Sequence, residues 1–178
     1  MVTLYDKTFM PFIHNKDIIA AIDKVGNEVN ECYKNSKDVP VVLVIMNGAI
    51  LFASELLQRL DFNLEVMSVK LSSYQGTNTS GAVKEISPIT GDVAGRSVLV
   101  IEDIVDTGGT VEHIAQMLEE KGAADVKICT LLLKPEVYNR DIPLDFVGIE
   151  IPNRFIVGFG LDYNELGRNL KDIYVLNR

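Results

Sequence analysis

The chain has 178 residues, of which 47% are hydrophobic and 24% are charged. A chain of this size can bury one hydrophobic core without disulfide or metal cross-links, and this composition excludes a mainly disordered, collagen-like or coiled-coil protein. Lys and Arg number 17 against 25 Asp and Glu, so the formal net charge is −8. Because binding to nucleic acid without sequence preference depends on basic side chains at the phosphates, we expect no nucleic-acid partner.

The cysteines and the longest apolar run indicate where the protein works. Cys32 and Cys129 form no CxxC motif and have apolar neighbours in the sequence, which predicts two buried free thiols and a reducing compartment. The run Val41–Met46 is too short to span a membrane, and the first residues carry no apolar signal segment. We therefore expect a cytoplasmic protein with no membrane partner, built as a single domain over residues 1–178.

Hydrophobic spacing in the first half of the chain predicts alternating helices and strands. Apolar residues recur every three or four positions over residues 16–33, which is typical of an amphipathic helix. Val41–Met46 is continuously apolar, as in a strand buried on both faces. A second helical pattern covers residues 49–60, and a second strand is predicted over residues 64–71. Residues 72–91 form a long polar loop with a short strand-like stretch, and such loops are often functional lids.

The second half of the chain continues the alternation. A third buried strand is predicted over residues 96–101, and a core-facing helix over residues 111–118 ends at Gly122. Three further strands are predicted over residues 126–133, 146–149 and 173–176. Strands that alternate with helices indicate an α/β fold with a mostly parallel twisted sheet flanked by helices, in which ligands bind at the carboxyl ends of the strands.

Two carboxylates and a glycine turn follow the third predicted strand. Glu102 and Asp103 are adjacent, and two carboxylates at the end of a buried strand are costly unless a cation, a ligand hydroxyl or a basic side chain meets them. Residues 106–110 (DTGGT) then begin a helix, whose N–H groups and dipole suit a phosphate. For the turn alone, an ordinary N-cap by Thr107 or Thr110 is the alternative. The acidic pair beside the turn favours a phosphate site.

Residues 98–110 (VLVIEDIVDTGGT) closely resemble the phosphoribosyl-diphosphate signature of the type I phosphoribosyltransferases. Residues 150–168, which begin EIPNRFIVGFG, resemble the purine-binding segment of the hypoxanthine-guanine phosphoribosyltransferases. The loop after the first strand is similar to the family's pyrophosphate loop. In relatives the bond that corresponds to Asn47–Gly48 is a cis peptide bond, and whether it is cis in this chain is open from the sequence. Some relatives carry Lys where this chain has Asn47, and many carry a basic or large residue where it has Gly109. The resemblance covers all but about the first forty residues.

The resemblance implies a reaction of purine salvage. A 5-phosphoribosyl group would pass from phosphoribosyl diphosphate to N9 of a 6-oxopurine, with Mg²⁺ as cofactor and pyrophosphate as the second product. Glu102 and Asp103 would receive the ribose hydroxyls, directly or through Mg²⁺, and Asp162 would hold a second Mg²⁺. The 5-phosphate would lie on the turn formed by Asp106, Thr107, Gly108, Gly109 and Thr110. Pyrophosphate would meet the backbone of Asn47 and Gly48 and the side chain of Arg168, under a flexible lid of about residues 72–84 that includes Ser73 and Tyr74.

The resemblance also implies how the base is bound. Asp106 would be the general base or proton partner at purine N7. Phe155 would stack on the purine, the backbone of Ile156 would meet its edge, and Lys134 would donate to the 6-oxo group. Without the resemblance, Phe155 would be an ordinary core residue and Lys134 a solvated strand end. The implied fold is that of the type I family, with a small hood from the N- and C-terminal segments, and its members are homodimers or homotetramers.

Two other functions remain open from the sequence. The first is a phosphoribosyltransferase for xanthine or another base, although an adenine enzyme should lack a donor such as Lys134 and pyrimidine enzymes use a different hood. The second is a regulator of the same fold that senses phosphoribosyl diphosphate and binds nucleic acid. That function needs a basic face, which the net charge of −8 disfavours. The order of preference among hypoxanthine, guanine and xanthine is also open.

Overall fold

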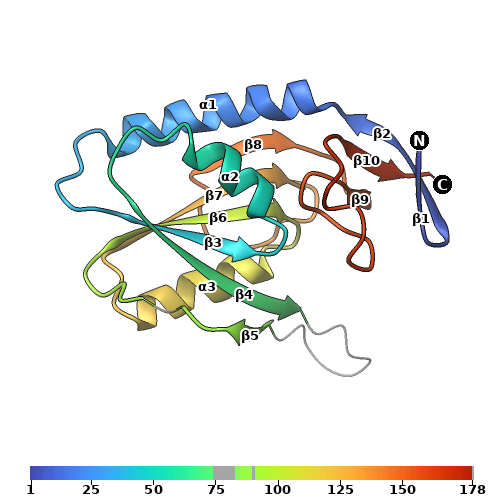
Figure 1. Cartoon of the computed structure of the whole chain (residues 1–178). Coiled ribbons are helices and arrows are strands. Elements are labelled where there is room, and N and C mark those ends of the chain that lie inside the picture. Colours follow the sequence, from blue (N-terminus) through green and yellow to red (C-terminus); the bar gives the residue numbers. More distant parts are fainter. Residues whose placement is uncertain (74–82, 90, 178) are drawn as a thin grey trace.

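The computed structural model describes residues 1–73, 83–89 and 91–177, and a large sheet forms its centre (Figure 1). This 6-stranded sheet has the order β5-β4-β3-β6-β7-β8. Five of these strands, β4, β3, β6, β7 and β8, run parallel to one another. The sixth, β5, is antiparallel to β4 at one edge of the sheet. The strands are β3 (Val41–Met46), β4 (Glu65–Ser73), β5 (Val83–Ser87), β6 (Ser97–Val105), β7 (Asp125–Leu133) and β8 (Phe146–Glu150).

Helices cover both faces of the large sheet, which confirms the predicted α/β architecture. On one face lie α1 (Asn15–Tyr33) and α2 (Ile50–Leu57), and on the other lies α3 (Gly109–Glu120) (Figure 1). Each face has its own cluster of buried side chains, with Ile18, Ile22 and Val25 on the α1 side. Val111 and Ile114 pack on the α3 side. Among the described residues, no helix has the length and apolar character needed to cross a membrane.

A second, smaller sheet joins the two ends of the chain. It has four strands in the order β1-β2-β10-β9, with β1 (Val2–Leu4), β2 (Lys7–Ile13), β9 (Ile156–Val157) and β10 (Ile173–Leu176). Figure 1 shows this sheet beyond the carboxyl ends of the parallel strands, with both termini beside it. The predicted hood from the N- and C-terminal segments is thereby confirmed. Its position places the segment after β8 over the edge of the large sheet where ligands bind in such folds.

Three details differ from the sequence-based expectations. β6 extends to Val105, so the acidic pair Glu102–Asp103 lies inside the strand rather than after it. β1, β2 and β9 were not predicted, because each is short or lacks a clear apolar alternation. Cys32 is exposed and only Cys129 is buried, so the prediction of two buried thiols is wrong for Cys32. Cys32 lies one position before Tyr33 on α1, and Tyr33 takes the buried position.

Candidate functional site

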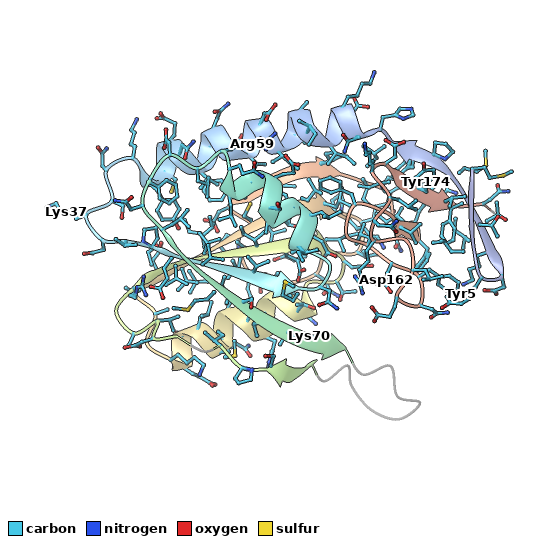
Figure 2. The ribbon with its side chains drawn as sticks, viewed as in Figure 1. Tyr5, Lys37, Arg59, Lys70, Asp162 and Tyr174 are labelled. Atoms are coloured by element: carbon cyan, nitrogen blue, oxygen red, sulfur yellow. The ribbon has the colours of Figure 1, made fainter. Side chains whose placement is uncertain are left out.

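A cavity of about 550 Å³ opens at the carboxyl ends of β3, β4 and β6. It brings together seven of the residues predicted from the sequence, namely Asn47, Gly48, Glu102, Asp103, Thr110, Asp162 and Arg168. Lys70 and Glu165 also line the cavity, and neither was predicted. Figure 2 shows Lys70 on β4 and Asp162 on the segment that follows β9. The cavity therefore joins strand ends of the large sheet to the C-terminal segment.

Glu102 and Asp103 form an acidic pair at the centre of this site, in which Glu102 is buried and Asp103 is half-buried. Glu102 is 5% exposed. The backbone N–H of Asp103 donates to Glu102 Oε1 at 3.1 Å, and that of Ile104 donates to Asp103 Oδ1 at 2.8 Å. Burial, with the neighbouring Asp103 charge, raises the pKa of Glu102 well above its ordinary value. Burial also raises the pKa of Asp103, against the opposing effect of the Arg168 charge.

This pair predicts how stability depends on pH. Because the pKa of Glu102 is raised by folding, the folded chain binds a proton more tightly than the unfolded chain does, so the free energy of unfolding falls as pH rises through the raised pKa. We expect the melting temperature of the ligand-free protein to fall as the pH rises above the ordinary range of glutamate titration, and to fall less steeply in Glu102→Gln. Thermal unfolding with a chelator present measures both slopes. Parallel curves for the two proteins would contradict a raised pKa.

The loop after β3 is pressed against the acidic pair. A Cβ added to Gly48 would lie 1.7 Å from Asp103 Oδ2, so only glycine fits at this position. A Cβ at Gly160 would lie 2.0 Å from the carbonyl oxygen of Gly48. The loop carries a cis peptide bond between Met46 and Asn47, one bond earlier than the resemblance to relatives indicated. Gly48 is thus held between β6 and the C-terminal segment.

The turn between β6 and α3 has the features of an anion site. Gly108 is the N-cap of α3, with a φ of 89° in the left-handed region, and no side chain caps the helix. The alternative of a Thr107 or Thr110 cap is therefore wrong. A Cβ added to Gly109 would meet nothing within 4 Å, so the space above the turn is open. The first N–H groups of α3 thus keep their hydrogen-bonding capacity for a ligand.

Lys134 and Asp106 are brought together beside this turn. Lys134 is 7% exposed and its Nζ donates to Asp106 Oδ2 at 2.7 Å. The side chain of Asp106 is 50% exposed. The backbone N–H of Lys134 also donates to the carbonyl of Val105 at 3.0 Å, which ties β7 to the end of β6. Lys134 is therefore not a solvated strand end, and a buried ammonium and a carboxylate adjoin one another here.

Phe155 offers an aromatic surface outside the core. Its side chain is 46% exposed, whereas Ile156 beside it is buried. The ring of Tyr163 meets Phe155 edge-on, with centroids 5.9 Å apart, and Lys7 of β2 lies over both rings. The Tyr163 hydroxyl donates to Asp6 Oδ1 at 2.8 Å. The N-terminal hairpin thus supports the aromatic segment, a role that its sequence did not indicate.

Asp162 and Arg168 close the other side of the cavity. Nη2 of Arg168 lies 2.8 Å from Asp162 Oδ1, and its Nη1 donates to the carbonyl of Gly160 at 2.9 Å. Its buried Nε has no hydrogen-bond partner among the residues described. A buried unpaired N–H is costly, so this group is suited to an incoming acceptor. Because Asp162 is already paired with Arg168, a cation bound by Asp162 would share its carboxylate with the Arg168 guanidinium.

Lys70 is the cation that the sequence reasoning missed. It lies opposite Met46 in the parallel pairing of β3 and β4, next to the loop that carries Asn47. Knowing this pairing would have predicted Lys70 as a site residue, because it places Lys70 beside Asn47, the position where some relatives carry Lys. The predicted lid over about residues 72–84 lies largely outside the described residues, and so does Tyr74. Ser73 ends β4.

Comparisons with known proteins agree on one family. Residues 13–164 match the family model described as the phosphoribosyl transferase domain. A hypoxanthine-guanine phosphoribosyltransferase of Lactococcus lactis subsp. lactis (strain IL1403) is 42% identical over 174 residues, covering 90% of this chain and 94% of the relative. A hypoxanthine phosphoribosyltransferase from Staphylococcus aureus has 34% identity and a TM-score of 0.87, over 94% of this chain and 91% of the other.

A second similar structure is a hypoxanthine phosphoribosyl transferase of Trypanosoma cruzi, studied for the role of its C-terminal region in oligomeric state and enzymatic activity. It has 28% identity and a TM-score of 0.88, over 99% of this chain and 95% of the other. These three proteins are named for hypoxanthine alone or for hypoxanthine and guanine. A regulator of the same fold and a transferase for an unrelated base are therefore not favoured.

Proposed function

Because the chain belongs to the phosphoribosyltransferase family, we propose that it is a purine-salvage enzyme that transfers the 5-phosphoribosyl group of phosphoribosyl diphosphate to N9 of hypoxanthine and guanine. The products are IMP or GMP and pyrophosphate. The observation that carries this proposal is the meeting of three features at the carboxyl ends of neighbouring strands. They are the acidic pair with its buried Glu102, the uncapped glycine turn and the Lys134–Asp106 pair. Membership of the family alone does not identify the residues that bind the substrates and catalyse the transfer.

The ribose 5-phosphate part of phosphoribosyl diphosphate lies along β6 and the start of α3. Glu102 and Asp103 receive the 2- and 3-hydroxyls of the ribose, directly or through a metal ion. The 5-phosphate lies on the turn at residues 106–110, where the N–H groups of an uncapped helix and the positive end of its dipole meet it. The open space above Gly109 accommodates the phosphate where many relatives carry a larger side chain.

Pyrophosphate lies between the loop after β3 and the C-terminal segment. The backbone of Asn47 and Gly48 is one side of this site, and Arg168, with its unpaired Nε, is the other. Since Asn47 brings no charge, Lys70 supplies a cation from the adjacent strand. These groups bind the charge that develops on the leaving group when the C1–O bond breaks.

The base lies between the aromatic segment and the Lys134–Asp106 pair. Phe155 presents its exposed ring to the purine, and the backbone of Ile156 meets the purine edge. The ammonium of Lys134 donates to the 6-oxo group, while the half-exposed carboxylate of Asp106 takes up the proton at N7. Both side chains are held before the base arrives, which reduces the cost of ordering them.

The residues present fit Mg²⁺ as the cofactor. Among the described residues no set of three or more His, Cys, Asp or Glu side chains could hold a metal on its own. Mg²⁺ typically takes one or two carboxylates and completes its shell with water and substrate oxygens, which suits Glu102 and Asp103, and separately Asp162. When bound, Mg²⁺ neutralises pyrophosphate and orients it. A cation at the acidic pair would also offset the buried charge that raises its pKa values.

Metal dependence tests this proposal. We expect IMP formation from phosphoribosyl diphosphate and hypoxanthine to stop when a chelator is added and to return with excess Mg²⁺. The chelator alone should leave the folded state intact, as followed by circular dichroism, because the described fold contains no structural metal cluster. Full turnover with the chelator present would contradict the assignment of Glu102, Asp103 and Asp162.

Assembly and location are part of the same proposal. We propose a homodimer or homotetramer in the cytoplasm. The C-terminal strand β10 of this chain is built into the small sheet, and the Trypanosoma cruzi relative was studied for the part its C-terminal region plays in oligomeric state. The buried free thiol of Cys129 agrees with a reducing compartment.

A further inference from the structure

The segment that follows β7, residues 134–142, packs against the phosphate turn at more than one point. At its start, Lys134 is paired with Asp106. Further along, a Cβ added to Gly108 would lie 2.6 Å from the ring of Tyr138 and 2.8 Å from Cγ of Arg140. These two side chains therefore lie directly against the backbone of the N-cap. The Tyr138 hydroxyl donates to the carbonyl of Ile142, which closes the segment into a compact loop.

The same loop places a cation beside an acidic residue of α3. Nε of Arg140 lies 2.9 Å from Oε2 of Glu112, which is in the first turn of the helix. An acidic side chain there interacts favourably with the helix dipole. For a helix whose N-terminus receives a dianionic phosphate, however, the Glu112 carboxylate is also a like charge close to the ligand. Arg140 offsets that charge.

We propose that Arg140 is a positioning residue for the 5-phosphate site. Its guanidinium neutralises Glu112, and its alkyl chain, together with Tyr138, holds Gly108 in the left-handed conformation that aims the first N–H groups of α3 at the ligand. Arg140 does not line the cavity at the carboxyl ends of β3, β4 and β6. The inference rests on the proposed function only in that the turn binds a sugar phosphate.

A double-mutant cycle tests the charge effect. Arg140→Gln keeps the Cγ that packs on Gly108 but leaves Glu112 unpaired. We expect it to raise KM for phosphoribosyl diphosphate by roughly two- to fivefold, the effect of a single charge near a helix end, with kcat and KM for hypoxanthine unchanged. Glu112→Gln alone should not raise KM, and the Glu112→Gln/Arg140→Gln pair should return it to the wild-type value. The increase should shrink at high salt, because the pair is partly exposed.

The matched control removes an ion pair of the same kind far from the turn. Arg96 is paired with Glu65 at 2.6 Å, just before β6 begins, so Arg96→Gln should leave KM for phosphoribosyl diphosphate unchanged. An unchanged KM in Arg140→Gln, an equal rise in Arg96→Gln, or a double variant no better than Arg140→Gln would each overturn the inference. Calorimetry with ribose 5-phosphate separates the two proposals. If wild type forms no nucleotide but binds this probe more tightly than Arg140→Gln does, the function fails and the inference stands.

Discussion

Lys134→Met is expected to remove most of the preference for hypoxanthine over adenine. Lys has three donors and no acceptor, so its buried ammonium can donate to the 6-oxo group of hypoxanthine, whereas it faces another donor in the 6-amino group of adenine. A site built around such a hydrogen bond can reject the wrong analogue by roughly 10⁴–10⁵. Methionine keeps much of the alkyl chain that fills the site, so the loss should fall on recognition rather than on packing.

The measurement is kcat/KM for hypoxanthine and for adenine with each protein. Wild type should use adenine barely at all, and Lys134→Met should lose most of its hypoxanthine activity while the ratio between the bases collapses. Lys37→Met is the matched control, because Lys37 is exposed and lies at the opposite end of the molecule from Asp162 (Figure 2). A ratio that survives in Lys134→Met would show that another group reads position 6.

Asp106→Asn should lower kcat by ~10²–10⁴ and leave the affinity for phosphoribosyl diphosphate nearly unchanged, which is the usual effect of removing a general base. The side chain is half exposed at the edge of the turn and pairs with Lys134 through one oxygen. Asparagine keeps that oxygen as an acceptor for Lys134, so the lysine stays in place. The proposed role predicts that the variant loses the ability to take up the proton of purine N7.

Single-turnover rates and ribose 5-phosphate binding separate the two parts of this expectation. Asp38→Asn is the control, because Asp38 is exposed in the segment before β3. Because Asp106 and Lys134 are in direct contact, the effects of their substitutions should not be additive. An unchanged kcat in Asp106→Asn would reduce Asp106 to a structural partner of Lys134.

Much of the large sheet was predictable because its elements repeat simple periods. β3 matches its predicted bounds, since its run of six apolar residues is short, rich in β-branched Val and Ile, and preceded by Pro40. The end of β6 was not predicted, because Glu102 and Asp103 interrupt the apolar run and only pairing with β7, as far as Val105 opposite Leu133, extends the strand. The hairpin of β1 and β2 was missed for a related reason. Its strands are stabilised by β10, which is more than 150 residues away in the sequence.

In the candidate site, too, the residues that are contiguous in the sequence could be predicted, and those brought together by strand pairing could not. The acidic pair and the glycine turn are contiguous in the sequence, so their chemistry could be predicted together. The contact of Lys134 with Asp106 spans 28 residues and depends on adjacent parallel strands, which no local pattern reveals. Lys70 enters the cavity through the pairing of β3 with β4. The support of Phe155 by Lys7 and Tyr163 depends on the fold of both chain ends.

The most direct test of phosphoribosyl transfer to 6-oxopurines is product analysis with single bases. The protein is incubated with phosphoribosyl diphosphate and Mg²⁺ and with hypoxanthine, guanine, adenine or uracil separately, and nucleotide and pyrophosphate are quantified by chromatography. We expect IMP from hypoxanthine and GMP from guanine, each with an equal amount of pyrophosphate, and essentially no AMP or UMP. AMP formed at a rate comparable to IMP, or no nucleotide from either 6-oxopurine, would contradict the proposed function.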